Sequence, residues 1–356
     1  MNKEFWNKKR VFLTGHTGFK GSWLSTWLIR MGAEVTGYAL VPPTVPSLFD
    51  LCNISLDLDS NEGNVCDFQH LSKVIRKSRP DIVFHMAAQS IVRASYDDPV
   101  ETYDTNVMGT VNLLQSIRDV DSVRACIVVT SDKCYENRER VWSFRESDPL
   151  GGRDPYSSSK GCAELVTSSF RSSFFEHSET AIASVRAGNV IGGGDWAKDR
   201  LIPDIMTALM AGKKVSIRNP DAIRPWQHVL EPLHGYLLLA EKLCHEGNRY
   251  AEPWNFGPYD SDVQPVSSIV IKLAEEWGTN DDWKSDGEKQ PHEANFLKLD
   301  SSKARSQLGW APKLSLDDAL AWIVEWYRAL ESRMDMKDFT NKQIATYESI
   351  ESNQHG

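Results

Sequence analysis

The sequence lacks the features of several large protein classes. It contains no run of about eighteen apolar residues, which a membrane-spanning helix would need, and its N-terminal stretch is charged, without the apolar segment of a secretory signal. Its six cysteines form no Cys-x-x-Cys pair and no metal-type spacing with histidine. We therefore expect free thiols, no bound metal, no membrane association and a cytoplasmic location.

Positive charge is also scarce. The chain has 40 Lys and Arg residues against 49 Asp and Glu residues, which gives a formal net charge of −9. Binding along the phosphate backbone of a nucleic acid needs clustered Lys and Arg side chains. We expect no nucleic-acid partner, and any anionic ligand has to meet a local basic pocket.

Short β-branched runs alternate with helical patterns in the first half of the chain, which is typical of βαβ units and a parallel sheet. The candidate strands are residues 11–14, 34–38, 81–88, 125–131 and 181–186. The candidate helices are residues 19–31, 68–77, 99–120, 155–175, 230–244 and 266–277. We predict an α/β fold, a Rossmann-type doubly wound parallel sheet with a smaller, mixed C-terminal lobe.

The domain organisation follows from the point where this alternation becomes irregular. We assign residues 1–188 to a dinucleotide-binding domain that includes the Tyr/Lys helix described below. Residues 189–335 form a substrate-binding lobe, from which strands and helices can return to the first domain. Residues 336–356 are polar and are expected to be a loose tail.

A glycine-rich segment joins the first candidate strand to the first candidate helix. The segment "TGHTGFKG" places Gly15, Gly18 and Gly21 in a strand-turn-helix context. Glycines here let backbone N–H groups approach a pyrophosphate, which then lies at the positive end of the helix. We predict dinucleotide binding, and a purely structural turn is the alternative. The second strand ends in "TGYALVPP" without the usual acid, so charge there does not decide between NAD and NADP.

The segment "DPYSSSKGCAE" places Tyr156 and Lys160 four residues apart on one helical face. Spacing alone is equally typical of a solvated surface pair. However, this helix follows the candidate strand 125–131 and its loop, at the edge where an α/β sheet has its binding crevice. A nearby ammonium favours the tyrosinate form of a phenol. We therefore predict that Tyr156 is the base for a substrate hydroxyl.

Together these motifs resemble the extended short-chain dehydrogenase/reductase family. In chain order they are "TGHTGFKG", "HMAAQ", "NVMGT", "TSD" and "YSSSK". The resemblance implies Tyr156 as the catalytic base, Lys160 as its partner and ribose ligand, and Ser131 as the hydroxyl that orients the substrate. An acid is common in the family where Asn64 stands. The resemblance also implies NAD as the cofactor, bound by Gly15, Gly18, Phe19, Gly21, Asn64, Val65, Ala87, Ala88, Gln89, Asn106, Tyr156 and Lys160.

Two further titratable residues, Asp132 and Lys133, follow Ser131. A surface ion pair at the end of a strand is the alternative reading. An epimerase or reductase of this family needs only Ser131, Tyr156 and Lys160, so the extra pair indicates a second proton transfer. Nucleotide-sugar 4,6-dehydratases need an acid that protonates the departing C6 hydroxyl and a base that takes the C5 proton. Asp132 fits the acid, and Lys133 stands where many dehydratases carry Glu. A lysine acts as a base only when neutral, which Asp132 opposes.

Longer segments such as "SDKCYEN" and "RAGNVIGGGDWAKDRLIPD" most resemble the branch of dehydratases that acts on CDP-glucose. That branch leads to 3,6-dideoxyhexoses, the sugars of lipopolysaccharide O-antigens, and the resemblance alone supplies the cytidine. It implies a lyase with internal C4-to-C6 hydride transfer through bound NAD. Arg presents a planar fork to phosphate oxygens. The candidate substrate-binding residues are Asn189, Arg200, Arg218, Arg224 and Asn255.

Several alternatives stay open. Trp226 and His228 are either a packed core pair or part of the substrate side, whereas His85 is expected to be a hydrogen-bonded core residue. A 4-epimerase or decarboxylase of the same family is the nearest rival function, and the Asp-Lys pair disfavours it. A dinucleotide-sensing module is less consistent with the Tyr-Lys pair. Family members pair through long helices beside the sheet, here 99–120 and 155–175, which implies a homodimer or homotetramer.

Overall fold

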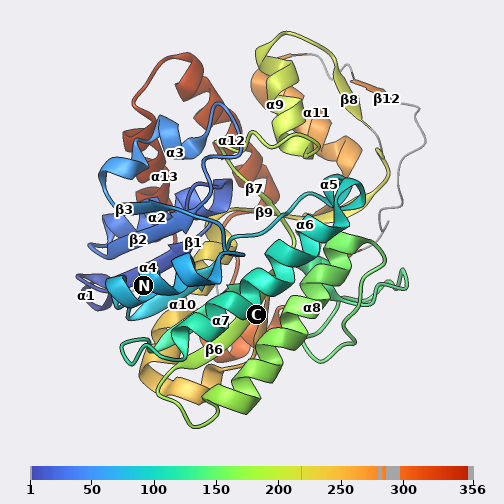
Figure 1. Cartoon of the computed structure of the whole chain (residues 1–356). Helices are drawn as coiled ribbons and strands as arrows, with labels where there is room; N and C mark the ends of the chain where they lie inside the picture. Colours follow the sequence, from blue (N-terminus) through green and yellow to red (C-terminus); the bar gives the residue numbers. More distant parts are fainter. Residues whose placement is uncertain (1, 218, 280–282, 286–296, 352–356) are drawn as a thin grey trace.

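The computed structural model describes residues 2–217, 219–279, 283–285 and 297–351, and within these residues seven parallel strands form the main sheet. Helices cover both faces of this sheet (Figure 1). The expected α/β class with a doubly wound parallel sheet is confirmed. In spatial order the strands are β10 (Pro253–Phe256), β6 (Ala181–Ala187), β5 (Ala125–Val129), β4 (Ile82–His85), β1 (Arg10–Thr14), β2 (Glu34–Ala39) and β3 (Asp59–Glu62).

The central strands are buried on both faces, which explains their near-continuous apolar sequences. The edge strand β3 differs, because its sequence "DSNE" is polar and largely exposed. It pairs with β2 on one side only. No hydrophobic run marks it, and for that reason it is missing from the strands expected from sequence.

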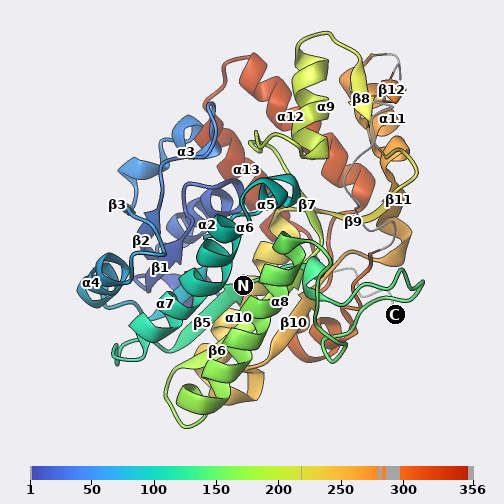
Figure 2. The ribbon, with the colours of Figure 1, turned by 45° about the vertical axis from the view of Figure 1, so that its right-hand side comes forward.

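Two helical layers enclose the sheet (Figures 1 and 2). One layer contains α4 (Phe68–Ser78), α7 (Gly109–Ile117) and α8 (Pro155–Phe170), and the other contains α2 (Phe19–Arg30), α10 (Leu230–Glu246) and α13 (Met336–Ser349). Each layer has its own buried apolar cluster against the sheet. Short helices lie at the rim: α1 (Lys3–Trp6), α3 (Leu48–Leu51) and α5 (Val92–Asp97).

The expected helix 99–120 is interrupted. It consists of α6 (Pro99–Tyr103), a π-helical turn at Asp104–Met108, and α7. A second π-helical turn, Arg171–Phe175, follows α8. The first turn contains Asn106, and π-helical turns are frequent where a side chain is needed at a functional position.

The smaller lobe contains two short sheets, which follow the orders β11 (Val263–Pro265), β9 (Ile223–His228), β7 (Asn189–Ile191) and β12 (Trp283–Ser285), β8 (Val215–Ile217). Its helices include α9 (Leu201–Met210), α11 (Val266–Trp277) and α12 (Leu316–Glu331). Two elements from residues 189–335, α10 and β10, lie in the main layers instead, where β10 extends the sheet beside β6.

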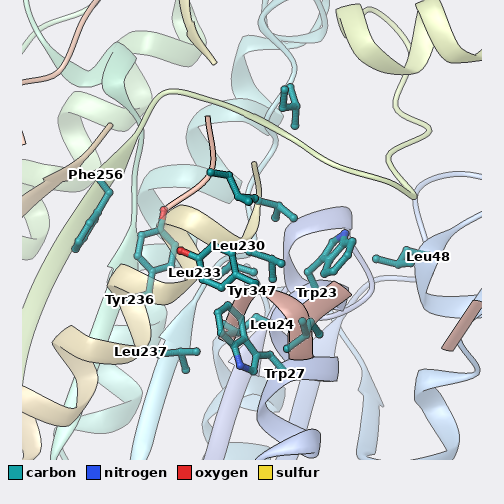
Figure 3. Close-up of a cluster of buried hydrophobic side chains, with 14 of the residues drawn as sticks. Trp23, Leu24, Trp27, Leu48, Leu230, Leu233, Tyr236, Leu237, Phe256 and Tyr347 are labelled. Carbon is teal, nitrogen blue, oxygen red and sulfur yellow. The ribbon is translucent and has the colours of Figure 1, made fainter. Parts of the chain in front are cut away.

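The expectation of a loose polar tail is wrong for residues 336–349, which form α13. Met336, Thr340, Gln343, Ile344 and Tyr347 of this helix are buried, while Asp338, Lys342, Thr346 and Ser349 are exposed. Figure 3 shows Tyr347 within the apolar cluster that includes Trp27. Overall composition did not reveal this amphipathic arrangement. Within the described ranges, no helix has both the length and the apolar character needed to cross a bilayer.

Candidate active site

The glycine turn after β1 forms a close-packed backbone cradle. Gly15 adopts a φ of +76°, and a methyl group added there would lie 2.7 Å from the backbone nitrogen of Ala87. A methyl group at Gly21 would lie 2.0 Å from the carbonyl oxygen of Gly15. Gly18 caps α2, which begins at Phe19. The first N–H groups of a helix have no partner within that helix, so this turn can hold the pyrophosphate of a dinucleotide.

The segment after β4 is held against this turn by Thr14 at the end of β1. The Thr14 hydroxyl accepts hydrogen bonds from the backbone of Met86 at 3.0 Å and of Ala87 at 3.1 Å. It also bonds with His85 Nδ1 at 2.8 Å. Burial lowers the pKa of His85 to about 3. His85 is therefore a neutral, hydrogen-bonded core residue, as expected.

Asn106 and Gln89 hold the loop that carries Ala88. Asn106 accepts a hydrogen bond from the Gln89 backbone at 2.9 Å and donates to the Gln89 carbonyl at 2.9 Å and to Ser159 Oγ at 2.8 Å. The Gln89 side chain donates to Thr102 and to the carbonyl of Ile91. These side chains fix the loop to α8. They would therefore help to bind a cofactor indirectly, by holding the backbone of the loop in position.

Asn64 and Val65 follow β3, at the same edge of the sheet. Asn64 Oδ1 accepts from the backbone of Cys66 at 2.9 Å, and its carbonyl accepts from Tyr38 at 3.1 Å. Val65 is buried and packs against Gly109, where an added methyl group would come within 2.7 Å of it.

Ser131, Asp132 and Lys133 leave β5 in a single turn of 3-10 helix. Ser131 donates to Asp132 Oδ1 at 3.0 Å, and it lies close enough to Tyr156 to lower the pKa of that phenol. Asp132 Oδ2 is buried and has no hydrogen-bond partner among the described residues. Burial raises the pKa of Asp132, although Lys133, Ser131 and Arg224 oppose this. A buried carboxyl with a raised pKa and one unused oxygen suits a proton donor.

Tyr156 and Lys160 lie on the first turns of α8, whose N-terminus is capped by Asp154. Burial raises the pKa of Tyr156 to about 12, while Ser131 and Arg200 act in the opposite direction. Burial lowers the pKa of Lys160 to about 8, and its ammonium donates to the Val129 carbonyl at 3.3 Å. The expected lowering of the tyrosine pKa is therefore not found for the protein's own groups, because desolvation outweighs Ser131 and Arg200.

Two of the expected substrate residues lie beside this group. Arg200 bonds with Asp195 at 3.0 Å and donates to Ser90 at 2.7 Å, and its charge lowers the pKa of Tyr156. Arg224 is buried and its charge lowers the pKa of Asp132. Asn189, on β7, lies opposite Trp226 of β9 in the ladder. Arg218 lies outside the described residues.

Asn255, expected to contact substrate, points into the interior. It is fully buried, accepts a hydrogen bond from Tyr135 at 2.8 Å and donates to the carbonyls of Phe144 and Asp300. With its amide used in this way, Asn255 supports the fold behind the site and does not reach a substrate. The expectation fails because "WNFG" does not reveal which way an alternating strand turns its side chains.

Trp226 and His228 are packed core residues. Trp226 donates to the Gln264 carbonyl at 3.2 Å. The His228 ring meets Trp23 and Trp322 edge to face, and burial lowers its pKa to about 3. Of the two readings left open by the sequence, the core pair is the one that the contacts support.

Lys20 is absent from the residues that the motifs point to. It belongs to the glycine turn, yet it feels the charges of Arg200, Lys160 and Asp132, and burial is the main cause that lowers its pKa to about 7. Its ammonium lies 5.6 Å from the ring centroid of Tyr236, which Figure 3 places in the cluster between α2 and α10. The sequence did contain a signal for Lys20, because it is a charged residue in a segment that requires only small and apolar residues.

A surface cavity of about 760 Å³ lies elsewhere, lined by Trp142, Tyr259 and Arg305 among others, and shares no residue with this constellation. Among the described residues, no three His, Cys, Asp or Glu side chains gather in a way that could hold a metal ion. The chemistry of the chain is therefore concentrated at the carboxyl edge of the main sheet.

Comparison with known proteins agrees with this geometry. The family model described as GDP-mannose 4,6 dehydratase matches residues 12–322. The chain belongs to this dehydratase family. This dehydratase is 55% identical over 354 residues to the CDP-glucose 4,6-dehydratase of Salmonella typhimurium, covering 98% of this chain and 99% of the relative. It is 27% identical to the dTDP-D-glucose 4,6-dehydratase of Mus musculus, covering 90% and 89% of the two chains.

Solved structures share the fold of this dehydratase. A dTDP-glucose 4,6-dehydratase of Streptomyces venezuelae, solved with NAD bound, has a TM-score of 0.78 or 0.79 in two structures, at 24% identity and with 92% of this chain covered. A UDP-glucose 4-epimerase of Thermotoga maritima has a TM-score of 0.78 at 24% identity, with 90% covered. In each case 99% of the solved chain is covered. The resemblance inferred from the motifs is confirmed at the level of family and fold.

Proposed function

We propose that this chain is a CDP-glucose 4,6-dehydratase, an NAD-dependent lyase that forms CDP-4-dehydro-6-deoxyglucose and water. The observation that carries the dehydration is the buried Asp132, with one oxygen unused, beside the Ser131 and Tyr156 pair. The cytidine rests on the 55% identity with the Salmonella relative, along nearly the whole of both chains. The product belongs to the precursors of 3,6-dideoxyhexoses.

The residues of the cradle fit NAD. Gly15 and Gly21 leave no room for a side chain between the turn and its neighbours, which brings backbone N–H groups to the surface of the turn. Gly15, Gly18, Phe19 and Gly21 would hold the pyrophosphate at the start of α2. Bound NAD supplies the hydride acceptor and donor of the reaction, at C4 and then at C6 of the sugar.

Oxidation at C4 begins with proton transfer to Tyr156. Ser131 donates to Asp132 and lies close enough to Tyr156 to lower its pKa, so it orients the C4 hydroxyl beside the phenol. Lys160 lies one helical turn from Tyr156 and is anchored on the Val129 carbonyl. Its ammonium stabilises the tyrosinate that accepts the proton.

Elimination follows across C5 and C6. The C4 ketone acidifies the C5 proton, which Lys133 takes, and the C6–O bond breaks as Asp132 protonates the departing hydroxyl to water. Lys133 then returns its proton to C5 when hydride arrives at C6. One proton has moved from O4 to Tyr156, and Asp132 has lost one. Because Ser131 bonds with Asp132 and lies close to Tyr156, it offers a path that carries the proton from Tyr156 back to Asp132 and so restores both groups.

The nearest alternative function, a 4-epimerase, shares the fold and needs only the Tyr-Lys-Ser set. The 4-epimerase reaction has no step that needs a buried acid beside the serine. A carboxyl buried without a full set of hydrogen bonds destabilises a protein. Its presence in the site therefore favours the dehydratase.

We also propose a homodimer formed through α6, α7 and α8. Apolar side chains are exposed along these helices and the π-helical turn between α6 and α7, including Val100 at 69%, Leu165 at 59% and Met108 at 48%. Such residues on neighbouring helices are typical of a covered face. Leu165→Glu should shift the protein towards monomer in light scattering, whereas a dimer unchanged in this variant would contradict the interface.

The labelled substrate tests the reaction itself. CDP-glucose deuterated at C4 is supplied with NAD, and the position of deuterium in the product is read by NMR. Deuterium at C6 is the expected result, since hydride passes internally from C4 to C6. Deuterium retained at C4 would indicate an epimerase, and an unchanged sugar would indicate a protein that binds a dinucleotide without turnover.

A further inference from the structure

A buried ion pair, Glu164 and Arg186, lies behind the catalytic turn. The two side chains are only 3% and 2% exposed. Arg186 donates to Glu164 twice, at 2.9 Å and 2.8 Å, and Ser184 donates to Glu164 at 2.7 Å. Neither residue is needed as an acid, a base or a substrate ligand in the reaction above.

Glu164 continues the row begun by Tyr156 and Lys160, since the three are spaced four residues apart on α8. Each of the three grips a different residue at the end of β5. Tyr156 lies close enough to Ser131 for that serine to lower its pKa, Lys160 donates to the Val129 carbonyl at 3.3 Å, and Glu164 accepts from the Thr130 hydroxyl at 2.5 Å. One helical face therefore sets the position of three consecutive residues of the catalytic strand.

Arg186 reaches the other end of the catalytic turn. It donates to the Tyr135 hydroxyl at 2.7 Å and to the Glu146 carbonyl at 3.2 Å. Tyr135 in turn donates to Asn255 at 2.8 Å, and its ring stacks on Phe144 with centroids 4.8 Å apart. Glu164 thus holds Thr130, and Arg186 holds Tyr135. These two contacts lie on either side of residues 131–134.

The energetics of the pair point the same way. Removing two charges from water costs several kcal/mol for each ion, and an apolar pair of similar volume often serves stability equally well. The polar groups of Glu164 and Arg186 are nonetheless directed at Thr130 and Tyr135, which lie on either side of the segment that carries the proposed acid and base. A demand for exact placement of a turn explains this arrangement better than stability does.

We infer that Glu164 and Arg186 are positioning residues that fix both ends of the segment Thr130–Tyr135, and thereby set Asp132 and Lys133 against C5 and C6 of the sugar. This inference rests on the proposed dehydration. The first oxidation depends mainly on Tyr156 and Lys160, which α8 carries directly. Elimination depends on the turn itself, so loosening the far end of the turn should slow elimination selectively.

Tyr135→Phe tests this with the loss of one hydroxyl, because the ring and its stacking on Phe144 remain. Losing a hydrogen bond to a charged group corresponds to about tenfold in rate. We expect elimination to slow at least about tenfold while oxidation at C4 changes less than about twofold. Single-turnover reactions, quenched and analysed by mass spectrometry, separate the 4-keto sugar that retains its C6 hydroxyl from the 6-deoxy product.

Tyr250→Phe is the matched control, a buried tyrosine that stacks on Trp254 outside this network. It should leave both rates unchanged. Equal slowing of both steps by Tyr135→Phe, or no slowing of either, overturns the inference. The wild type in the same assay tests the proposed function separately, because absence of the 6-deoxy product there refutes the dehydratase and not the positioning role.

Glu164→Gln gives a second, independent readout. The charge of Glu164 raises the pKa of Lys160 against the effect of burial. Removing that charge while keeping the side-chain shape should move the alkaline fall of the oxidation rate to lower pH. A variant with an unchanged pH profile and unchanged partition between the two steps contradicts the inference, whatever its melting temperature.

Discussion

Glu231 on α10 offers a quantitative test of how burial sets the electrostatics of this fold. Its carboxylate accepts hydrogen bonds from Tyr347 at 2.6 Å and from the backbone of Leu314 at 2.7 Å and Lys313 at 2.9 Å. Burial nevertheless raises the pKa of Glu231 from 4.5 to about 7. The group therefore gains a proton more readily in the folded protein than in the unfolded chain.

The sign of the effect on stability follows from linkage. A pKa that is higher in the folded state favours folding at pH values below about 4.5, and this contribution is lost as the pH rises through about 7. With about 1.4 kcal/mol for each pKa unit, the loss is about 3 kcal/mol. Glu231→Gln keeps the shape and cannot ionise, so it should match the wild type near pH 4.5 and be more stable by about 3 kcal/mol at pH 8.

Chemical denaturation of both proteins at several pH values between 4.5 and 8 measures this difference. Glu246→Gln is the control, because Glu246 is partly exposed on the same helix and its hydrogen bond from Lys242 lowers the pKa of its carboxyl. Its difference from the wild type should carry the opposite sign. If the Glu231→Gln difference stayed constant across the range, burial could not be the dominant cause of the shift, and the reasoning would fail.

Three further outcomes are expected at the site. Tyr156→Phe should lower the rate of oxidation at C4 by about 10²- to 10⁴-fold, the usual contribution of a general base, and stopped-flow absorbance of the nicotinamide checks it. Asp132→Asn and Lys133→Met should each slow elimination by about 10²-fold or more while oxidation proceeds, so that the 4-keto sugar with its C6 hydroxyl accumulates in quenched samples. A full dehydration rate in either variant would remove its acid or base role. Gly21→Ala should abolish NAD binding in calorimetry, since its methyl group would lie 2.0 Å from the Gly15 carbonyl oxygen, and retained affinity would contradict the cradle.

The buried parallel strands and the cofactor turn could be predicted because local physics dominates there. Strands such as β5 must be apolar on both faces, and a turn such as that at Gly15 requires a conformation that only glycine adopts freely. The edge strand β3 could not be predicted, since its polar residues make no demand on the core. Periodicity also missed α13, whose buried residues contact α2, far away in the sequence.

The candidate site divides in a similar way. Motifs with fixed spacing located Ser131 and Tyr156, because a strand end and a helix start meet at one edge of the sheet. The direction of an isolated side chain is set by tertiary contacts, so Asn255 was assigned to the substrate although Tyr135 and two carbonyls occupy its amide. The tyrosine pKa was misjudged for a related reason, since the sequence displays neighbouring charges but conceals the cost of desolvation.

The return of α10 and β10 to the main layers governs how this enzyme can be redesigned. Cutting the polypeptide after residue 188 would strip β6 of its neighbour β10 and uncover the apolar face that α10 protects. Neither half would fold independently. A graft that swaps nucleotide preference between relatives would have to be discontinuous, exchanging pieces on either side of residues 230–256 while leaving that stretch in the host.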